Sequence, residues 1–155
     1  MFQRIVHTSN DFSLTVVRVV LGLVMFAHGA QKVLGWFGGY GFSATMGFFT
    51  HGMGIPAPLA VLAIAAEFLG GLGLLIGLLG RIAAFGVLCN MVVAVLTVHY
   101  RNGFFMNWAG HQKGEGFEYH LLAITLALAV MIAGSGALSA DRLLATASPQ
   151  QTEKR

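Results

Sequence analysis

Charged residues are scarce in this sequence of 155 residues. Only 10% of the residues are Asp, Glu, Lys or Arg, and 56% are apolar, whereas an ordinary soluble domain has about 25% charged residues. So few charges could not cover the surface of a soluble globular domain. So apolar a composition also excludes an intrinsically disordered chain. The composition therefore favours a protein that lies in a lipid bilayer.

Cysteine is represented only by Cys89, which excludes an intrachain disulfide and a dithiol redox relay. The net charge is only +3 and the nine Lys and Arg residues are scattered, so the sequence predicts no nucleic-acid partner. The six His residues lack the compact spacing of zinc ligands, so we expect no metal site. No phosphate-binding loop or convincing dinucleotide fingerprint is present.

Four long apolar runs lie at about residues 13–34, 57–79, 81–100 and 118–137. Each is close to the roughly 20 residues that a helix needs to cross a bilayer. Backbone groups in hydrocarbon must be paired within the segment, and continuous runs lack the alternation of barrel strands. The short connections then predict an all-α, up-down, four-helix transmembrane bundle. We expect one domain over residues 1–147, followed by a polar tail at 148–155.

The distribution of positive charge predicts the orientation of this bundle. Placing both termini on one side assigns more Lys and Arg residues to that side than to the other, which by the positive-inside rule predicts cytoplasmic termini. The residues on the side of the termini are Arg4, Arg18, Arg81, Arg142, Lys154 and Arg155, and those on the other side are Lys32, Arg101 and Lys113.

Two loops between the runs have unusual compositions. The first, at about residues 35–55, is rich in Gly and Phe and has apolar side chains at helical spacing, which predicts a short helix in the membrane interface. A re-entrant or packed loop is the alternative. The second, at about residues 101–117, alternates aromatic and polar residues. The Trp, Tyr and Phe residues of the two loops predict an aromatic belt at one membrane face.

The first run carries Arg18, His28 and Lys32 within an arc of about 80°, taken at 100° per residue. A charged side chain at the bilayer centre raises the free energy of inserting a helix into the membrane by about 2.5–3.5 kcal/mol. We therefore expect each of these residues to have a structural or functional role. Gly22 and Gly29 share the arc, and a face that is both small and polar predicts packing inside the bundle. The alternative is that Arg18 and Lys32 extend to opposite interfaces.

Glu67 lies about ten residues into the second run, near the midplane of a span of this length. Its side chain is too short to reach an interface, so we expect it to be protonated or paired with Arg18 or Lys32. Such a buried pair can be purely structural. Small residues around Glu67 are spaced to allow close helix approach.

The third and fourth runs add candidates at their outer ends. Asn90, Thr97 and Arg101 share one face of the third run, and His99 is expected to point away from it. Glu118 opens the fourth run, and His120 is expected to point elsewhere.

Five ionisable residues could then converge in a polar pocket that opens outward beneath the aromatic loops, the usual form of a ligand site. They are His28, Lys32, Glu67, Arg101 and Glu118.

Several motifs, in order along most of the chain, resemble those of the DoxX family of small membrane proteins. They are RVVLGLVMFAHGAQK at residues 18–32, EFLGGLGLLIG at 67–77, GFFMNW at 103–108 with GEGFEY at 114–119, and GSGALSADR at 134–142. The last motif departs from many members, which have Pro where Ser135 stands. The resemblance implies a multi-pass protein of the bacterial inner membrane that is associated with an oxidoreductase.

The resemblance also implies a quinone as ligand and a redox protein as partner, because a DoxD relative is a subunit of thiosulfate:quinone oxidoreductase. In this hypothesis His28 and Glu67 are catalytic and transfer protons to and from the quinone oxygens. Lys32 or Arg101 stabilises the developing negative charge. Phe105 and Trp108 pack on the ring, and Arg18 and Glu118 complete the substrate-binding set.

Two other classes of function stay open. One is a non-redox module that binds or transports a small solute or a lipid, and the other is a membrane scaffold whose charges only hold helices together. Haem is disfavoured because His28 and His99 lack a supporting motif. The small-residue faces would permit a homodimer without requiring one.

Overall fold

The computed structural model describes residues 2–147, and every regular element in that range is helical. The expected polar tail at 148–155 lies outside the described residues. The elements are α1 (Phe2–Val6), α2 (Phe12–Leu34), η1 (Trp36–Gly38), α3 (Gly41–Gly47), η2 (Phe48–Gly52), α4 (Ala57–Ile76), α5 (Gly80–Ala94), η3 (Val95–His99), η4 (Tyr100–Asn102), α6 (Glu118–Ala133) and α7 (Ala140–Ala147).

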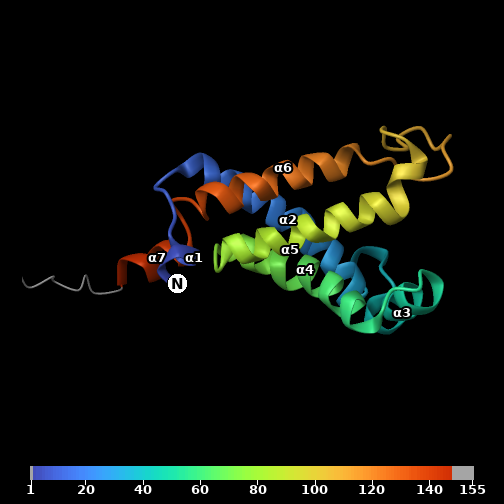
Figure 1. The fold of residues 1–155 in the computed structure, drawn as a ribbon, viewed down its shortest axis with the longest axis horizontal. Helices are drawn as coiled ribbons and strands as arrows, with labels where there is room; N and C mark the ends of the chain where they lie inside the picture. The colour runs from blue at the N-terminus through green and yellow to red at the C-terminus, as the bar shows by residue number, and fades with distance from the viewer. Residues whose placement is uncertain (1, 148–155) are drawn as a thin grey trace, which may run out of the picture.

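The four long helices form a closed bundle. Helix α2 packs against α4 and α6, and α5 packs against the same two helices. The short helices α1 and α7 lie at one end, with the turn between α4 and α5, and the two long loops lie at the other end (Figure 1). The predicted all-α fold and its up-down course are confirmed.

Glycines set the closest approach in the bundle, between α2 and α4. A Cβ atom at Gly29 would collide with the backbone of Phe68, and one at Gly71 would collide with the backbone of Phe26. These positions therefore allow the two helix backbones to touch, which is how small residues promote helix association in a bilayer.

The helix ends differ from the predicted boundaries for local reasons. Helix α4 stops at Ile76 because Gly77 adopts φ 73°, and α6 stops at Ala133 because Gly134 adopts φ 91°. Glycine reaches such angles with no Cβ strain, so it commonly ends helices. The third run leaves the α-helical form after Ala94 and continues as the π turn η3 and the 3₁₀ turn η4.

The first long loop contains the predicted short helix, which is α3 and continues into the π turn η2. Phe42 and Phe48 on this segment are 47% and 61% exposed. Apolar side chains that are exposed at the end of a bundle suit a helix lying in a membrane interface.

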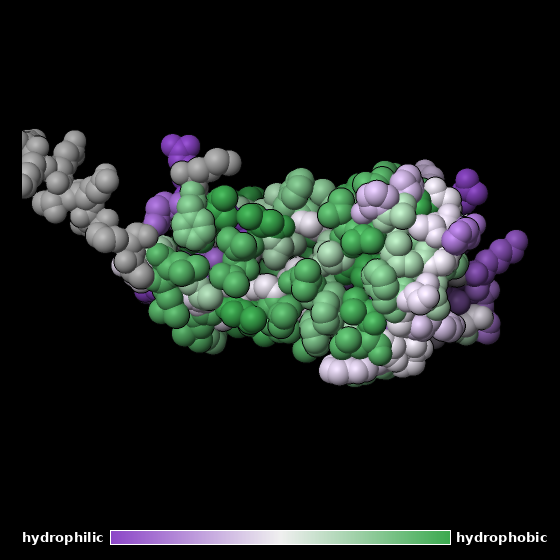
Figure 2. Space-filling model, turned by 90° about the horizontal axis from the view of Figure 1, so that it is seen from below, coloured by the Kyte–Doolittle hydropathy of each residue, from purple (hydrophilic) through white to green (hydrophobic). Residues whose placement is uncertain are grey.

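Three segments are long and apolar enough to cross a membrane, namely Phe12–Leu34, Ala57–Ile76 and Gly80–Asn102. Helix α6, with 16 residues, is apolar but shorter. Their outward side chains, such as Leu62 and Leu96, are exposed. In the view of Figure 2, apolar side chains cover the middle of the molecule and hydrophilic side chains lie towards its two ends. This distribution matches an apolar bilayer between two aqueous phases.

Candidate functional site

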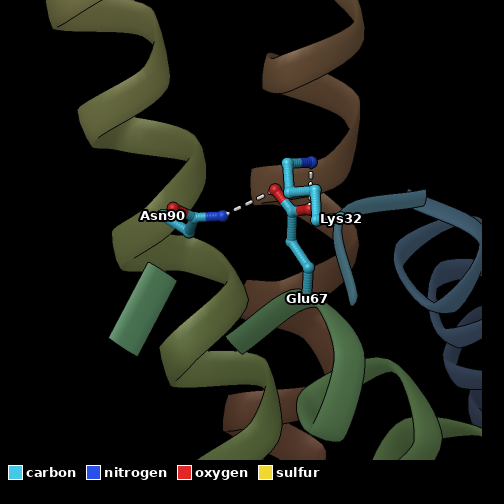
Figure 3. Close-up of polar contacts among 3 residues, drawn as sticks. All are labelled: Lys32, Glu67 and Asn90. Atoms are coloured by element: carbon cyan, nitrogen blue, oxygen red, sulfur yellow. Dashed lines mark hydrogen bonds and ion pairs between the residues drawn. The ribbon is translucent and has the colours of Figure 1, made fainter. Parts of the chain in front are cut away.

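Three polar side chains from three helices meet inside the bundle (Figure 3). Lys32 on α2 donates a hydrogen bond from Nζ to Oε2 of Glu67 on α4, which makes an ion pair. Asn90 on α5 donates from Nδ2 to Oε1 of Glu67 at 2.8 Å. The Glu67 side chain is 9% exposed and that of Lys32 is 25% exposed. Of the two pairings expected from the sequence, the one with Lys32 is confirmed.

The close approach of α2 to α4 places this pair. Gly29 lies one turn before Lys32 and abuts the backbone of Glu67 and Phe68. Because α2 has no side chain at this point, Lys32 comes within reach of the carboxylate. Lys32 also lies in the last turn of α2, where the helix dipole favours a cation.

Arg18 does not join Glu67, although the two residues share the interior. It lies 14 positions before Lys32, about 21 Å along the helix. Its guanidinium is buried and donates to main-chain carbonyls at the opposite end of the bundle. The acceptors are Leu74, Leu75 at 2.8 Å, Ser135 at 2.8 Å and Leu138 at 2.6 Å. Its expected role in substrate binding therefore finds no support in its position.

Asp141 completes the group around Arg18. Its carboxylate accepts hydrogen bonds from the amides of Leu79 at 2.7 Å and Gly80 at 2.9 Å, and from Oγ of Ser135 at 2.6 Å. It is 1% exposed. A carboxylate at the first amides of α5 satisfies donors that have no partner within the helix. We call Arg18, Ser135 and Asp141 the Arg18 cluster.

Glu118 organises the second long loop instead of entering the Glu67 pair. Its Oε1 accepts hydrogen bonds from the amide of Met106 at 2.8 Å and from Nε1 of Trp108 at 3.1 Å. Arg101 is exposed, and within residues 2–147 the only ion pair is Lys32–Glu67. Arg101 and Glu118, which both stand at the loop end, are therefore not paired in the described part of the chain.

An apolar groove lies between this loop and α6. It encloses about 690 Å³, which falls within the roughly 300–1,000 Å³ of small-molecule sites. It is lined by Phe104, Met106, Trp108, Glu118, Tyr119, Leu121 and Leu122. A second cavity of about 180 Å³ between α2 and α6 shares Tyr119 and Leu122 with it. Of the two expected aromatic residues, Trp108 lines the groove, whereas Phe105 is not among its lining residues.

Tyr119 connects the groove to the polar interior. Its ring centroid lies 6.0 Å from that of His28, and its hydroxyl is buried. His28 is exposed and lies one turn before Lys32 on α2. We call Lys32, Glu67 and Asn90, with His28 and Tyr119, the Glu67 cluster. Of the residues expected to converge, this cluster holds His28, Lys32 and Glu67, and it lacks Arg101 and Glu118.

A pair of histidines lies beside Tyr119. The ring centroids of His99 and His120 are 4.0 Å apart, and His99 Nδ1 donates to the carbonyl of Glu115 at 2.8 Å. His120 is 5% exposed. Its Nδ1 and the Tyr119 hydroxyl are both buried and have no hydrogen-bond partner among residues 2–147. Buried polar atoms nearly always have a partner, which is often an ordered water.

The sequence predicts that His99 points away from the face of Asn90, Thr97 and Arg101, provided that a regular helix continues that far. In the structure the ring of His99 lies beside that of His120, and the helix is not regular there. The π turn at Val95–His99 holds more residues per turn, and π turns of this kind are frequent at functional sites. This turn changes the direction of His99 and brings it to His120.

A comparison with models of known protein families shows to which family this chain belongs. The DoxX family model matches residues 13–100, which is more than half of the chain. The chain belongs to the DoxX family. The match contains Lys32, Glu67 and Asn90, whereas Tyr119 and His120 follow it.

One relative of this DoxX protein is a Bacillus subtilis (strain 168) protein described as "Putative oxidoreductase CatD". The two are 29% identical over 135 residues, which cover 87% of this chain and 89% of the relative. No solved structure matches the chain. Family membership and the apolar helices together identify a membrane protein that is homologous to a protein described as an oxidoreductase.

Proposed function

We propose that this DoxX protein is a membrane subunit of an oxidoreductase system and binds a quinone in the groove beside Tyr119. One observation carries the proposal: the ring of Tyr119 lines the apolar groove, and its hydroxyl is buried without a hydrogen-bond partner among residues 2–147. A quinone site needs both an apolar slot for the ring and proton-exchanging groups within reach.

The lining of the groove fits such a ligand. Trp108 and Phe104 offer aromatic faces to a flat ring, for which offset stacking is favourable. The Trp108 indole is held by Glu118, so it is positioned in advance of binding. The second cavity, on the bilayer side of α2 and α6, adjoins the groove at Tyr119 and Leu122 and suits an isoprenoid chain.

A bound quinone would supply the chemistry of accepting two electrons and two protons, giving the quinol. The electrons come from a partner protein that carries a redox cofactor, because Cys89 alone provides no dithiol. The chain itself binds the ring, excludes water from it and holds protons at His28 and the Tyr119 hydroxyl. Lys32 binds Glu67 and offsets negative charge that develops nearby.

We place the protein in the bacterial inner membrane with both termini in the cytoplasm. The described Lys and Arg residues at the end with α1 and α7 outnumber those at the loop end, as the positive-inside rule requires. The groove then opens to the outer side. Reporter fusions after α7 and in the second long loop would test this, and a translocated reporter after α7 would contradict it.

Blocking the groove gives the sharpest test of the proposed ligand. Leu122→Trp adds an indole at a lining residue that is 67% exposed, and Ile132→Trp makes the same change on α6 at a residue that is 77% exposed and outside the lining. We expect a short-chain ubiquinone or menaquinone to raise the melting temperature of the wild type and of Ile132→Trp. Leu122→Trp should weaken binding roughly tenfold or more.

The proposal fails if neither quinone shifts the melting temperature and no quinone copurifies from native membranes by mass spectrometry. A non-redox binding module for a lipid or small solute is the second candidate. It is favoured by the almost entirely apolar lining of the groove. A lipid that copurifies and binds in the Leu122-dependent manner, without quinone, would favour that function.

A further inference from the structure

We propose that His99, His120 and Tyr119 form a water-bridged proton path from the loop end of the bundle to the buried Lys32–Glu67 pair. The path rests on the proposed function for its use, because quinone reduction consumes protons. Whether the path exists depends on the geometry and hydration of these residues and not on whether a quinone binds. It includes residues that the sequence prediction left outside the site.

The polar side chains follow one another from the second long loop to the Lys32–Glu67 pair. His99 is hydrogen-bonded to the loop at Glu115, and its ring lies 4.0 Å from that of His120. The rings of His120 and Tyr119 are 5.2 Å apart, and those of Tyr119 and His28 are 6.0 Å apart. His28 lies one turn before Lys32 on α2, and Lys32 binds Glu67. No other set of described residues continues the polar interior towards the loop in this way.

Two buried polar atoms lie along the path. The Tyr119 hydroxyl and His120 Nδ1 are buried without a partner in residues 2–147, and they belong to consecutive residues. Leaving each atom unpaired destabilises the fold by about 1–3 kcal/mol, whereas one ordered water satisfies two or more such atoms. Water at this place would also connect the histidine pair to Tyr119 across gaps that are too long for direct hydrogen bonds.

The ring atoms of His99 define where a proton enters. A carbonyl oxygen only accepts, so the contact with Glu115 fixes the hydrogen on Nδ1 and leaves the lone pair on Nε2. Nε2 takes a proton from solvent and passes it through water to His120, and Tyr119 passes one on to Glu67. Each transfer breaks one N–H or O–H bond and forms another, and no electrons move.

The charged and titratable groups that face this path come from every packed element. They are His28 and Lys32 from α2, Glu67 from α4, His99 from η3, Tyr119 and His120 from α6, and Glu115 and Glu118 around the second long loop. At the inner end the carboxylate of Glu67 binds Lys32 and Asn90, and its oxygens are the acceptor at which the path ends.

Water-edited solid-state NMR of the full chain in lipid vesicles, with labelled His and Tyr, tests whether the path is wet. We expect magnetisation to pass from water to His120 and Tyr119 nearly as fast as to the exposed His111. If His120 and Tyr119 stay dry on that timescale, the proposal is overturned whether or not quinone binds.

Proton uptake by the reconstituted protein, followed with a pH dye while a bound quinone is chemically reduced, gives the second readout. His120→Phe, outside the groove lining, should slow uptake roughly 100-fold at an unchanged quinone Kd. Tyr119→Phe should slow the uptake that accompanies reduction of bound quinone to a similar extent, and His51→Phe, a change outside the path, should not slow it. Wild-type uptake in Tyr119→Phe overturns the path. If quinone does not bind at all, the proposed function fails and the NMR result alone decides the path.

Discussion

Arg18 and Glu67 are both buried and charged, yet the polar atoms of their two clusters are satisfied in different ways. In the Arg18 cluster, the guanidinium and the carboxylate bind carbonyls, amides and one hydroxyl of chain segments that must stay in place. In the Glu67 cluster the partners are side chains from three helices, and the neighbouring Tyr119 and His120 retain unpartnered atoms. The first arrangement fixes a fold, whereas the second leaves room for protons and a ligand.

The difference also appears in the surroundings of the two clusters. Arg18 and Asp141 connect the end of α4, the start of α5 and the segment between α6 and α7. No cavity among those described for residues 2–147 is lined by Arg18 or Asp141. Tyr119 of the Glu67 cluster lines both cavities. Burial of charge therefore does not by itself mark a functional site in a membrane bundle.

Disrupting the Arg18 cluster should have the largest effect on stability. Arg18→Leu leaves four carbonyls without their donor, and each buried acceptor left unpaired costs about 1–3 kcal/mol, so we expect a loss of at least about 3 kcal/mol in the free energy of unfolding. Denaturant titration in detergent micelles measures it. Arg101→Leu, at an exposed site, should change stability by less than about 0.5 kcal/mol. Equal losses in both variants would contradict the comparison.

Disrupting the Glu67 cluster should reduce activity more than stability. Glu67→Gln keeps the shape and a hydrogen-bond acceptor for Asn90, but it removes the charge that Lys32 binds. We expect a loss of about 1–3 kcal/mol in stability and of about 10²–10⁴-fold in quinone-linked turnover with a redox partner.

The double variant Lys32→Met, Glu67→Gln separates the two effects. Removing both charges should restore much of the stability, because no uncompensated ion remains buried. Turnover should stay low. Full turnover in this variant would show that the ion pair only holds α2 to α4, as a scaffold would require.

Separating α2 from α4 should give a smaller loss. Gly29→Ala places a Cβ atom 2.5 Å from the backbone nitrogen of Phe68, whereas ordinary contact begins at 3.4 Å, so the two helices must move apart. Overpacking of this kind lowers stability by about 1–3 kcal/mol. Gly47→Ala, where a Cβ would meet nothing within 4 Å, is the matched control and should be neutral. A neutral Gly29→Ala would show that α2 and α4 are free to shift.

The spans, the bundle and the Lys32–Glu67 pair could be predicted because they depend on features that one sequence displays. These are run length, glycine spacing, and an acid that cannot reach an interface. The place of Arg18 could not be predicted in the same way. Its partners are carbonyls set free where α4 ends at Gly77 and where the chain turns after α6, and every residue has a carbonyl.

The histidine pair could not be predicted because helical phase was assumed constant. The π turn at Val95–His99 is a deviation within an apolar run, and nothing in its residue types marks it. Tyr119 was assigned to the aromatic belt, which accounts for its ring but not for its buried hydroxyl. The part of the site beyond Lys32 and Glu67 is therefore visible only in the three-dimensional structure.

The smallest expected effect is the most informative about the difference between the clusters. Ser135→Ala in the Arg18 cluster removes a hydroxyl that donates to Asp141, so we expect a loss of about 1–3 kcal/mol in stability. Tyr119→Phe removes a hydroxyl that has no protein partner in residues 2–147. If water bridges this hydroxyl, as we propose, its loss should change the free energy of unfolding by less than about 1 kcal/mol. A dry, unpaired hydroxyl would make Tyr119→Phe clearly stabilising, by about 1–3 kcal/mol. A loss as large as that of Ser135→Ala would mean that the Glu67 cluster is held as firmly as the Arg18 cluster, and the two would no longer differ in kind.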